Sequence, residues 1–538
     1  MKVVVIGGVA GGPSFATRLR RLDETAEIVL IEQGAHISYA SCALPYYLGG
    51  VVPELDSLIE RTPAGLKEKN NIEVRVFHQL TQIDPAKKIL TIKNLQTEEM
   101  YEESYDTLVL ATGTRAVLPP IKGIDTAKNV FTLRNVTDAA EIMAYMNTHL
   151  PRHVAILGAG VAGLEIAENL KQRGITVTII DQAATVALPY DSEIAEIIQD
   201  ELETNGIKLI MKQTVKEVSE AGRKITLANG RELAIDLLIV AAGVKMNNEI
   251  AQAAGVKLAT DGHILVDQKL RTNVSDIYAI GDVIETTSLI NGLPIPSMLS
   301  SAANRQGHLL ADILHGADLT YPGYIGVGVA KIFGLTASYA GYTENMLQRV
   351  GITNYKTIFI TPFDHAYFYP DAKRLNLKII FEEETGKILG GQAVGERGVD
   401  KRIGELSVAI TGKLTVHDLP ALELPYSPPY STTRDPLNTA GYVAINQLSK
   451  IAETIKASEI PAEDLKTAFF LDIREPDKPK SGSIEATKNI PLSELRERMA
   501  EIPRDRKVYL TFRKGLNTYN AARILAGKGI EAIMIEEN

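Results

Sequence analysis

The start of the chain alternates short apolar runs with a glycine-rich turn and a helical pattern. Residues 2–6 (KVVVI) predict a buried strand, and Gly7-Gly8-Val9-Ala10-Gly11-Gly12 follows it directly. Apolar residues then recur at helical spacing through Arg21, and residues 27–31 predict a second strand. That strand ends in Glu32, 20 residues after the last glycine. The order strand, turn, helix, strand is typical of a βαβ unit.

The same pattern returns from residue 153. A strand over 153–157 precedes Gly158-Ala159-Gly160-Val161-Ala162-Gly163, a helix is predicted over 164–173, and a strand over 176–180 ends in Asp181. Two apolar segments also repeat, one downstream of each glycine loop: YDTLVLATG at 105–113 and IDLLIVAAG at 235–243. The repetition predicts two dinucleotide-binding units, the second inserted into the first, with residues 272–282 (TNVSDIYAIGD) returning to the first.

The rest of the chain lacks a further glycine loop. We predict an α/β protein with two Rossmann-like domains, an α+β domain, a polar helical linker and a small C-terminal α/β domain. The strands predicted for the last domain are 469–473, 508–511 and 532–535. The predicted domains are 1–114 with 242–321, 115–241, 322–446, the linker 447–465, and 466–538.

The second loop, GAGVAG, matches G-x-G-x-x-G in the context that a dinucleotide requires. Its glycines allow backbone N–H groups to approach a pyrophosphate, and the helix that follows adds a favourable dipole. Asp181 is placed to accept a hydrogen bond from the ribose 2′-hydroxyl. Residues 182–207 contain no Lys or Arg to balance a 2′-phosphate. The pattern therefore favours NADH over NADPH.

The first loop is a weaker match, because Val9 occupies the middle glycine position. Glu32 and the pair Gly281-Asp282 support a nucleotide there as well. Two nucleotide units in one chain predict FAD and NADH, between which a hydride is passed.

Composition limits the partners and the compartment. The chain has 538 residues, 45% hydrophobic and 23% charged, with 57 Lys+Arg against 66 Asp+Glu and a net charge of −9. That balance argues against nucleic acid binding. No apolar run reaches membrane-spanning length, and no signal-peptide pattern opens the chain. The single cysteine excludes an internal disulfide and a thiolate metal cluster. We expect a cytoplasmic protein without a membrane partner or a metal.

That cysteine, Cys42, lies in ISYASCALPYYLGG at residues 37–50. Ser38 or Ser41 could cap a helix beginning near it, so that the thiol faces the positive helix end, which favours the thiolate. Its position just after the strand over 27–31 brings it within reach of the first nucleotide. A lone cysteine is otherwise most often a buried apolar residue, but the placement here predicts a reactive one.

With these motifs in place, residues 1–445 resemble the flavin-dependent pyridine nucleotide–disulfide oxidoreductases. Within them the chain is similar to the single-cysteine branch of coenzyme A-disulfide reductases and NADH oxidases or peroxidases. The motifs are GGVAGG, SYASCALPYYLGG, LATGTRA, GAGVAGLE, TNVSDIYAIGD and SAANRQG. The resemblance implies a homodimer built by the third domain. It implies FAD on Gly7, Gly12, Glu32, Thr112, Gly113, Gly281 and Asp282, and the nicotinamide cofactor on Gly158, Gly160, Gly163 and Asp181.

Two departures select the branch. The peroxide- and oxygen-reducing relatives carry a histidine where this chain has Ala10, so the resemblance favours the coenzyme A-disulfide reductases. HAYFYP (365–370) and LPYSPPY (424–430) resemble the segments whose tyrosines reach the partner subunit's cysteine in those enzymes. Phe368 stands at the first tyrosine of the family's YYP pair, which leaves Tyr367 and Tyr369 as candidates, with Tyr426 from the second segment.

The implied reaction is thiolate attack by Cys42 on a sulfur–sulfur bond. Coenzyme A (CoA) persulfide would leave a Cys42–S–S–CoA mixed disulfide and release hydrosulfide, whereas CoA disulfide would release CoA thiol. Reduced flavin then returns electrons to Cys42, and a tyrosine hydroxyl could protonate the leaving thiolate. Local cations for the CoA phosphates are Arg18, Arg20 and Arg21, of which Arg18 and Arg21 share a helix face, and Arg61. Asn304 and Arg305 of SAANRQG are further substrate-binding candidates.

The tail, 466–538, resembles a rhodanese domain through LDIREP, NIPL and VYLTFRKGLNTYNAA. Phe512 stands at the position of that family's nucleophilic cysteine and Asn517 at that of a usual loop arginine, so no persulfide can form there. Arg513 and Lys514 could still bind an anion. The tail favours CoA persulfide or polysulfide over CoA disulfide as substrate. Two alternatives stay open: an NADH oxidase or peroxidase that cycles Cys42 through sulfenic acid, and a redox-sensing flavoprotein without turnover.

Overall fold

The structure is a computed structural model that describes residues 1–451, 453–475, 484, 486–511 and 515–536. It divides into two compact units, each described by itself below. Unit 1 comprises Met1–Pro189, Ile198–Gly326 and Ala330–Phe333, and unit 2 comprises Tyr190–Ile197, Val327–Val329 and Gly334–Asn538. No described helix is long and apolar enough to cross a membrane.

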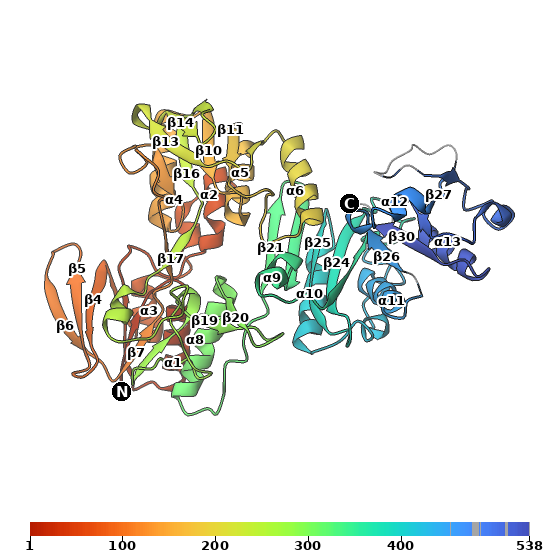
Figure 1. Cartoon of the computed structure of the whole chain (residues 1–538). Helices are drawn as coiled ribbons and strands as arrows, with labels where there is room; N and C mark the ends of the chain where they lie inside the picture. Colours follow the sequence, from red (N-terminus) through yellow and green to blue (C-terminus); the bar gives the residue numbers. More distant parts are fainter. Residues whose placement is uncertain (452, 476–483, 485, 512–514, 537–538) are drawn as a thin grey trace. The chain divides into compact units, whose positions relative to one another are not determined.

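Unit 1 contains a five-stranded parallel sheet that carries the first glycine loop (Figure 1). Its three central strands are almost continuously apolar and buried, which is typical of a parallel sheet covered on both faces. Helix α1 (Gly11–Leu22) follows β1 and packs closely on α8 (Ser300–Leu314). The sheet order is β18 (Ile277–Ala279), β7 (Thr107–Leu110), β1 (Lys2–Ile6), β2 (Glu27–Glu32) and β3 (Glu73–Val76). Because β18 pairs with β7, the predicted return of residues 272–282 to the first unit is confirmed.

A second parallel sheet of unit 1 repeats this arrangement around the second glycine loop. The strand that precedes the loop lies at the centre, as in the first sheet, and α5 (Val161–Gln172) follows the loop. The order is β9 (Val130–Thr132), β16 (Leu237–Val240), β10 (His153–Leu157), β11 (Thr176–Ile180) and β12 (Lys208–Ile210). The prediction of two Rossmann-like units is therefore confirmed.

Smaller elements of unit 1 extend these two domains. Helix α2 (Leu44–Gly49) packs on α5, and α4 (Val136–His149) follows β9. The remaining strands are antiparallel: β4 (His78–Asp84), β5 (Ile89–Asn94) and β6 (Met100–Ser104); β13 (Val215–Ser219), β14 (Lys224–Leu227) and β15 (Glu232–Ala234); β8 (Thr114–Ala116) with β17 (Val244–Met246); and β19 (Glu285–Thr287) with β20 (Pro294–Pro296).

Unit 2 begins with an α+β domain, as the sequence predicts. Its five-stranded sheet is antiparallel across β22, β25, β24 and β23. Helices α10 (Val399–Thr411) and α11 (Pro436–Leu448) pack against the sheet, and α9 (Glu344–Arg349) follows β22. The order is β21 (Val327–Ile332), β22 (Leu335–Gly341), β25 (Ile388–Gly395), β24 (Leu375–Glu382) and β23 (Tyr355–Ile360).

The C-terminal part of unit 2 is a parallel α/β domain, drawn in blue in Figure 1. The strands predicted over 469–473, 508–511 and 532–535 are confirmed to within a residue or two. Helix α13 (Leu516–Ala526) follows β29 and contacts β30. The order is β26 (Thr454–Lys456), β30 (Ala532–Glu536), β29 (Val508–Leu510), β27 (Phe469–Asp472) and β28 (Lys488–Asn489).

The predicted helical linker over 447–465 is wrong. Helix α11 ends at Leu448, and β26 pairs in parallel with β30 as the edge strand of the C-terminal sheet. Among the described residues that follow α11 in this stretch, the helical pieces are a 3-10 turn, Ala457–Glu459, and the start of α12 (Asp464–Thr467). Ile455 and Ile460 pack against the cluster of Phe470 and Tyr509. The polar composition of the stretch led to the wrong prediction, because these two isoleucines among polar residues belong to the core of the C-terminal domain.

Candidate active site

The first glycine loop is shaped by close backbone contacts. Gly7 has φ of +110°, and a Cβ there would lie 2.1 Å from the carbonyl oxygen of Ala111. A Cβ on Gly12 would lie 2.0 Å from the carbonyl oxygen of Gly7. These two glycines therefore let β1, β7 and α1 converge at one point, which is what a phosphate-binding turn requires.

The second loop repeats this geometry. Gly158 has φ of +118°, and its Cβ would lie 2.6 Å from the carbonyl oxygen of Ala241, while a Cβ on Gly163 would lie 2.1 Å from that of Gly158. Gly160 differs, because a Cβ there would meet nothing within 4 Å. No neighbouring atom of the protein therefore requires a glycine at this position. The missing side chain instead leaves room for a pyrophosphate to approach the backbone closely.

An acidic side chain ends the second strand of each unit and is held by backbone amides. The Glu32 carboxylate accepts hydrogen bonds from the Gly8 N–H (2.8 Å) and the Gly34 N–H (2.7 Å). Asp181 accepts from the Ala159 N–H (2.6 Å) and the Ala183 N–H (2.7 Å). Burial raises the pKa of Glu32. Each carboxylate keeps free lone pairs and can therefore accept a hydrogen bond that a ribose hydroxyl donates.

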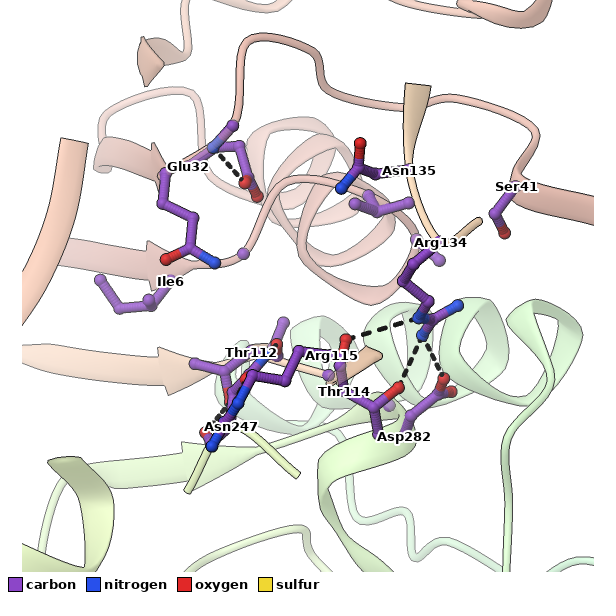
Figure 2. Close-up of a pocket in the computed structure, with 18 of the residues that line it drawn as sticks. Ile6, Glu32, Ser41, Thr112, Thr114, Arg115, Arg134, Asn135, Asn247 and Asp282 are labelled. Carbon is purple, nitrogen blue, oxygen red and sulfur yellow. Dashed lines mark hydrogen bonds and ion pairs between the residues drawn. The ribbon is translucent and has the colours of Figure 1, made fainter. Parts of the chain in front are cut away.

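A cavity of about 900 Å³ lies over the first loop (Figure 2). Gly7, Glu32, Thr112, Gly113, Gly281 and Asp282, all predicted for FAD, line it together with Cys42. Gly12 does not line it; its part is the helix–loop contact described above. The cavity has the size of a small-molecule site, and its bare glycine turn and acidic edge fit FAD. The structure thus brings the cysteine and the first nucleotide site into one cavity.

Arg134 is a cavity residue that the sequence analysis missed. Its Nη2 donates to Thr114 Oγ1 (2.7 Å) and lies 3.3 Å from Asp282 Oδ2, and Figure 2 shows it pointing at both. Burial raises the pKa of Asp282, and the Arg134 cation opposes this rise. The one signal in the sequence is that Arg134 comes two residues after VFT (130–132), a short strand-like run. This signal is weak, because the partner Asp282 lies 148 residues away.

Cys42 is exposed and lies in a 3-10 turn, Ser41–Ala43, directly before α2. The alternative of a buried apolar cysteine is therefore contradicted. The predicted serine cap is also wrong: the N-cap of α2 is Ala43, and no side chain caps either helix. The chain enters through the turn, whose backbone closes by an Ala43 N–H to Ala40 carbonyl bond of 2.9 Å.

A half-buried acid lies near α2, the helix that follows the cysteine turn. The Tyr46 hydroxyl donates to Glu165 Oε1 on α5 (3.4 Å). Burial is the main cause that raises the pKa of Glu165 to about 7; the Tyr46 hydrogen bond opposes this rise and the neighbouring Glu168 adds to it. Burial and Glu165 raise the pKa of Tyr46 to about 12. Lys331 is paired with Glu168, so Glu165 has no cation of its own among the described ion pairs.

This acid gives a pH prediction. Glu165 ionises near pH 7 when folded and near 4.5 when unfolded, so between these values the native state binds more protons and stability falls as pH rises. From pH 5 to 8 the unfolding free energy should fall by about 1–2 kcal/mol relative to Glu165→Gln, a figure reduced for partial exposure. Urea unfolding of both proteins measures it. Glu141→Gln, at an exposed position of α4, should leave the wild-type slope unchanged. Equal slopes for Glu165→Gln and wild type would contradict the assignment.

The predicted cations are not equivalent. Arg18 pairs with Asp312 of α8, Nη2 to Oδ1 2.6 Å, so its charge is compensated. Arg20 is buried, 4% exposed, and donates to five backbone carbonyls. Its interpretation as a phosphate ligand is wrong, because it braces the end of α1. Exposed on the surface of unit 1 are Arg21, Arg61, Asn304 and Arg305.

The candidate tyrosines lie in unit 2, whereas Cys42 lies in unit 1. Tyr367, Tyr369 and Tyr426 are 75%, 43% and 48% exposed. Their two segments are adjacent, since the Ala366 N–H donates to the Pro428 carbonyl (3.2 Å). In the tail, Asn517 lies in α13, and Phe512, Arg513 and Lys514 lie outside the described residues.

The paired glycine contacts allow the two cofactor sites to be separated. Gly12→Ala would force its methyl group onto the Gly7 carbonyl, so FAD affinity should fall at least about tenfold. Gly163→Ala meets the Gly158 carbonyl instead, so FAD should stay bound while the KM for NADH rises at least about tenfold. Flavin absorbance measures the FAD that stays bound, and stopped-flow reduction of the flavin at varied NADH concentration measures the effect on NADH. Gly404→Ala on α10, with open space at its Cβ, is the control; identical phenotypes for both loop variants would contradict the assignment.

Comparison with known families decides the class. Residues 1–307 match the family described as pyridine nucleotide-disulphide oxidoreductase, and residues 328–436 match its dimerisation domain. The chain belongs to this family. As a pyridine nucleotide-disulphide oxidoreductase it uses FAD and NAD(H), and the predicted fold class and cofactors are confirmed.

Several relatives narrow the comparison. The coenzyme A disulfide reductase of Staphylococcus epidermidis is 33% identical over 82% of this chain and 99% of its own length. The reduced CoADR-RHD of Bacillus anthracis is 41% identical, with a TM-score of 0.97 over 99% of this chain and 96% of that one. A NAD-dependent persulfide reductase from A. fulgidus is 36% identical, with a TM-score of 0.91 over 100% and 99%. The latter two extend through the C-terminal domain.

Proposed function

We propose that this protein is an NADH-dependent flavoprotein that reduces CoA persulfide, CoA disulfide or related polysulfides through Cys42. One observation carries the proposal: the only cysteine of the chain is exposed in the cavity that the first glycine loop, Glu32 and Asp282 also line. Relatives named coenzyme A disulfide reductase and persulfide reductase support the substrate class.

The sulfur chemistry follows from one thiol. The Cys42 thiolate attacks the CoA-bound sulfur of CoA–S–SH, which forms Cys42–S–S–CoA and releases HS⁻. Two electrons and one proton then split the mixed disulfide into CoA thiol and the Cys42 thiolate. Bound FAD would supply these two electrons after it has accepted them from NADH. The sum is NADH + CoA–S–SH giving NAD⁺ + CoA–SH + HS⁻, and CoA disulfide would release CoA thiol in place of HS⁻.

The residues around the thiol have distinct proposed parts. Gly7, Glu32 and Asp282 hold FAD beside Cys42, and Arg134 orients the Asp282 carboxylate. Gly160 and Asp181 hold NADH; the Asp181 carboxylate, with no cation in 182–207, disfavours a 2′-phosphate. Arg21, Arg61, Asn304 and Arg305 are the exposed candidates for the CoA phosphates, with Arg18 weakened by its pairing to Asp312.

We further propose a homodimer, for which the dimerisation-domain match is the support. In such a dimer Tyr367, Tyr369 or Tyr426 would protonate the thiolate that leaves the partner subunit's cysteine. We assign the C-terminal domain as a rhodanese-like domain without its cysteine, which supports persulfide as substrate, and we place the enzyme in the cytoplasm, where thiols stay reduced.

The test is anaerobic NADH consumption by the purified holoenzyme. CoA persulfide, CoA disulfide and hydrogen peroxide are compared side by side, and released hydrosulfide is measured. We expect the fastest turnover with CoA persulfide and one hydrosulfide per NADH. Turnover chiefly with peroxide would overturn the proposal in favour of a peroxidase, although Ala10, at the cavity wall, provides no base. A single reduction event without steady turnover would favour a sensor.

A further inference from the structure

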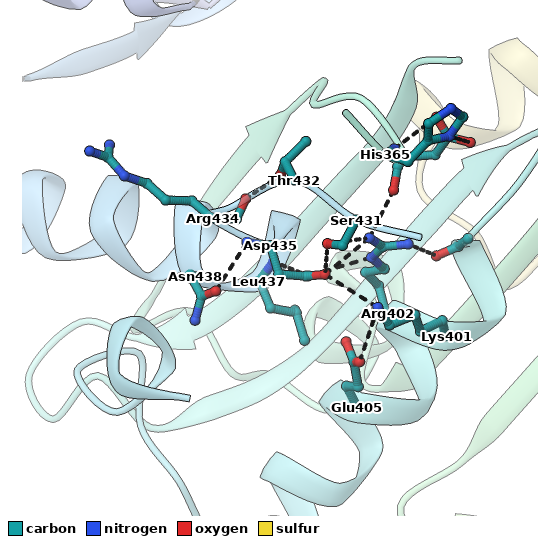
Figure 3. Close-up of polar contacts among 12 residues, drawn as sticks. His365, Lys401, Arg402, Glu405, Ser431, Thr432, Arg434, Asp435, Leu437 and Asn438 are labelled. Atoms are coloured by element: carbon teal, nitrogen blue, oxygen red, sulfur yellow. Dashed lines mark hydrogen bonds and ion pairs between the residues drawn. The ribbon is translucent and has the colours of Figure 1, made fainter. Parts of the chain in front are cut away.

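Both tyrosine segments of unit 2 are tied to one buried guanidinium. Arg402 of α10 is 1% exposed. Its Nη2 donates to the carbonyl oxygen of Asp364 (2.9 Å), the residue that precedes HAYFYP, and to Ser431 Oγ (3.1 Å), the residue that follows LPYSPPY. Figure 3 shows the guanidinium lying between these two stretches of chain. One side chain thus binds the residue next to each tyrosine segment, Asp364 before the first and Ser431 after the second.

A buried carboxylate fixes the arginine in turn. Arg402 Nη2 lies 3.0 Å from Asp435 Oδ2, and the Ser431 hydroxyl donates to the same oxygen (2.7 Å). Asp435 is 3% exposed and caps α11 in a capping box with Asn438. Since a helix cap cannot shift without its helix, the guanidinium has a rigid anchor.

The first segment is a closed loop whose tip carries the tyrosines. The Asp364 carboxylate accepts from the His365 N–H (2.9 Å) and the Lys373 N–H (2.8 Å), which closes the base of the loop. His365 Nδ1 lies 2.9 Å from Asp364 Oδ2, and its Nε2 lies 3.2 Å from the Pro370 carbonyl. The loop is therefore internally braced, and its only described link to α10 is the Arg402 bond to the Asp364 carbonyl.

The second segment is braced in the same way. The N–H groups of Tyr430 and Ser431 both donate to the Ser427 carbonyl (2.8 and 3.1 Å). The Ala366 N–H to Pro428 carbonyl bond joins the two segments. Two stiff loops that touch once would still rotate about that contact. The guanidinium removes this freedom, because one nitrogen of its rigid plane, Nη2, donates to both loops.

We propose that Arg402 is a positioning residue that sets the tyrosine hydroxyls of both segments in one arrangement for the reaction at the partner subunit's cysteine. The inference rests on the proposed function, since only the tyrosines would touch the reacting atoms. Misplacing a reacting group by about an ångström can cost up to a hundredfold in rate, so a loosened pair of loops should lower kcat and leave NADH oxidation by the flavin untouched.

The experiment uses full-length holoenzyme with Arg402→Lys and Ser431→Ala. Lysine keeps a cation beside Asp435, but its ammonium ends one bond short of the position of Nη2, the nitrogen that donates to both the Asp364 carbonyl and Ser431. Ser431→Ala removes one link and leaves the buried pair intact, so it remains informative if the lysine variant fails to fold. The matched control is Lys401→Met: Lys401 also lies near Asp435 Oδ2 (3.6 Å) but touches neither segment in the described contacts.

We expect kcat with CoA persulfide or CoA disulfide to fall about tenfold in Arg402→Lys and less in Ser431→Ala. The KM for NADH and the anaerobic reduction of FAD by NADH should match the wild type. Under native conditions chymotrypsin should cleave Arg402→Lys within residues 367–369, after Tyr367 or Phe368, several-fold faster than it cleaves the wild type, as located by mass spectrometry. Lys401→Met should behave as wild type in every assay.

Two outcomes would overturn the inference. One is an Arg402→Lys variant indistinguishable from Lys401→Met in kcat and in cleavage at 367–369. The other is a uniform loss, in which FAD content, FAD reduction and kcat fall together, because that marks a general structural role. If the wild type itself turns over neither CoA substrate, the proposed function fails, while cleavage at 367–369 still decides whether Arg402 holds the loops.

Discussion

Cys42→Ser is expected to lower NADH-dependent turnover of CoA persulfide and CoA disulfide by at least about a thousandfold. Serine keeps the shape of the side chain, but an alcohol is not ionised near neutral pH and cannot form the mixed disulfide. Reduction of FAD by NADH should persist, because the glycine loops and their acids are untouched. Steady-state NADH consumption and single-turnover flavin bleaching measure the two halves separately.

Ser41→Ala is the matched control for this variant. It alters the neighbouring residue in the same 3-10 turn, and because Ser41 caps no helix, turnover should stay near the wild-type rate. Mass spectrometry of wild type treated with CoA disulfide should show one added CoA per chain, and none on Cys42→Ser. Retained turnover in Cys42→Ser would mean that the electrons pass from flavin to substrate without this thiol.

Lys378→Met is expected to destabilise unit 2 by about 3–5 kcal/mol, a value typical of removing one partner from a buried ion pair. Lys378 is 1% exposed on β24. Its ammonium lies 3.0 Å from Asp191 Oδ2, 3.2 Å from Glu193 Oε2, and is also paired with Glu344. Burial alone would lower the pKa of Lys378, but these carboxylates raise it. Methionine fills the space and leaves three acids without their shared cation.

Lys356→Met on the neighbouring strand β23 is the matched control. Lys356 and its partner Glu383 are both about half-exposed, 43% and 49%, so the loss should stay within about 0.5 kcal/mol. Urea unfolding, followed by far-UV circular dichroism, compares the two variants. Similar midpoints for both would show that the buried cluster contributes no more than a surface pair.

The elements of the fold and of the site that could be predicted are those that depend on a short-range sequence pattern. Both glycine loops, their flanking strands and the acids Glu32 and Asp181 follow from short-range pattern, because a tight turn between a buried strand and a helix admits few sequences. The return of residues 277–279 to the first sheet was predictable only because the apolar segments repeat. Cys42 was found by its position after β2 rather than by its own chemistry.

The parts that could not be predicted depend on distant partners. Arg20 reads as a surface cation beside Arg21, yet five carbonyls bury it. Arg134 gained meaning only when Asp282 came within reach, and Lys378 sits in a strand whose neighbours are apolar. No periodicity marks such residues, because their partners lie in other elements or in irregular turns.

The edge position of β26 decides where the chain can be cut. A fragment that starts at residue 466 would lose this strand and leave the outer backbone groups of β30 unpaired, including the Met534 N–H that donates to Glu453 (2.9 Å). A bare parallel edge of apolar residues is a template for self-association. Residues 453–456 therefore cover the edge of β30 and protect it from pairing with another chain. A C-terminal fragment that retains them should stay monomeric in dilute solution, whereas one that begins at residue 466 should aggregate.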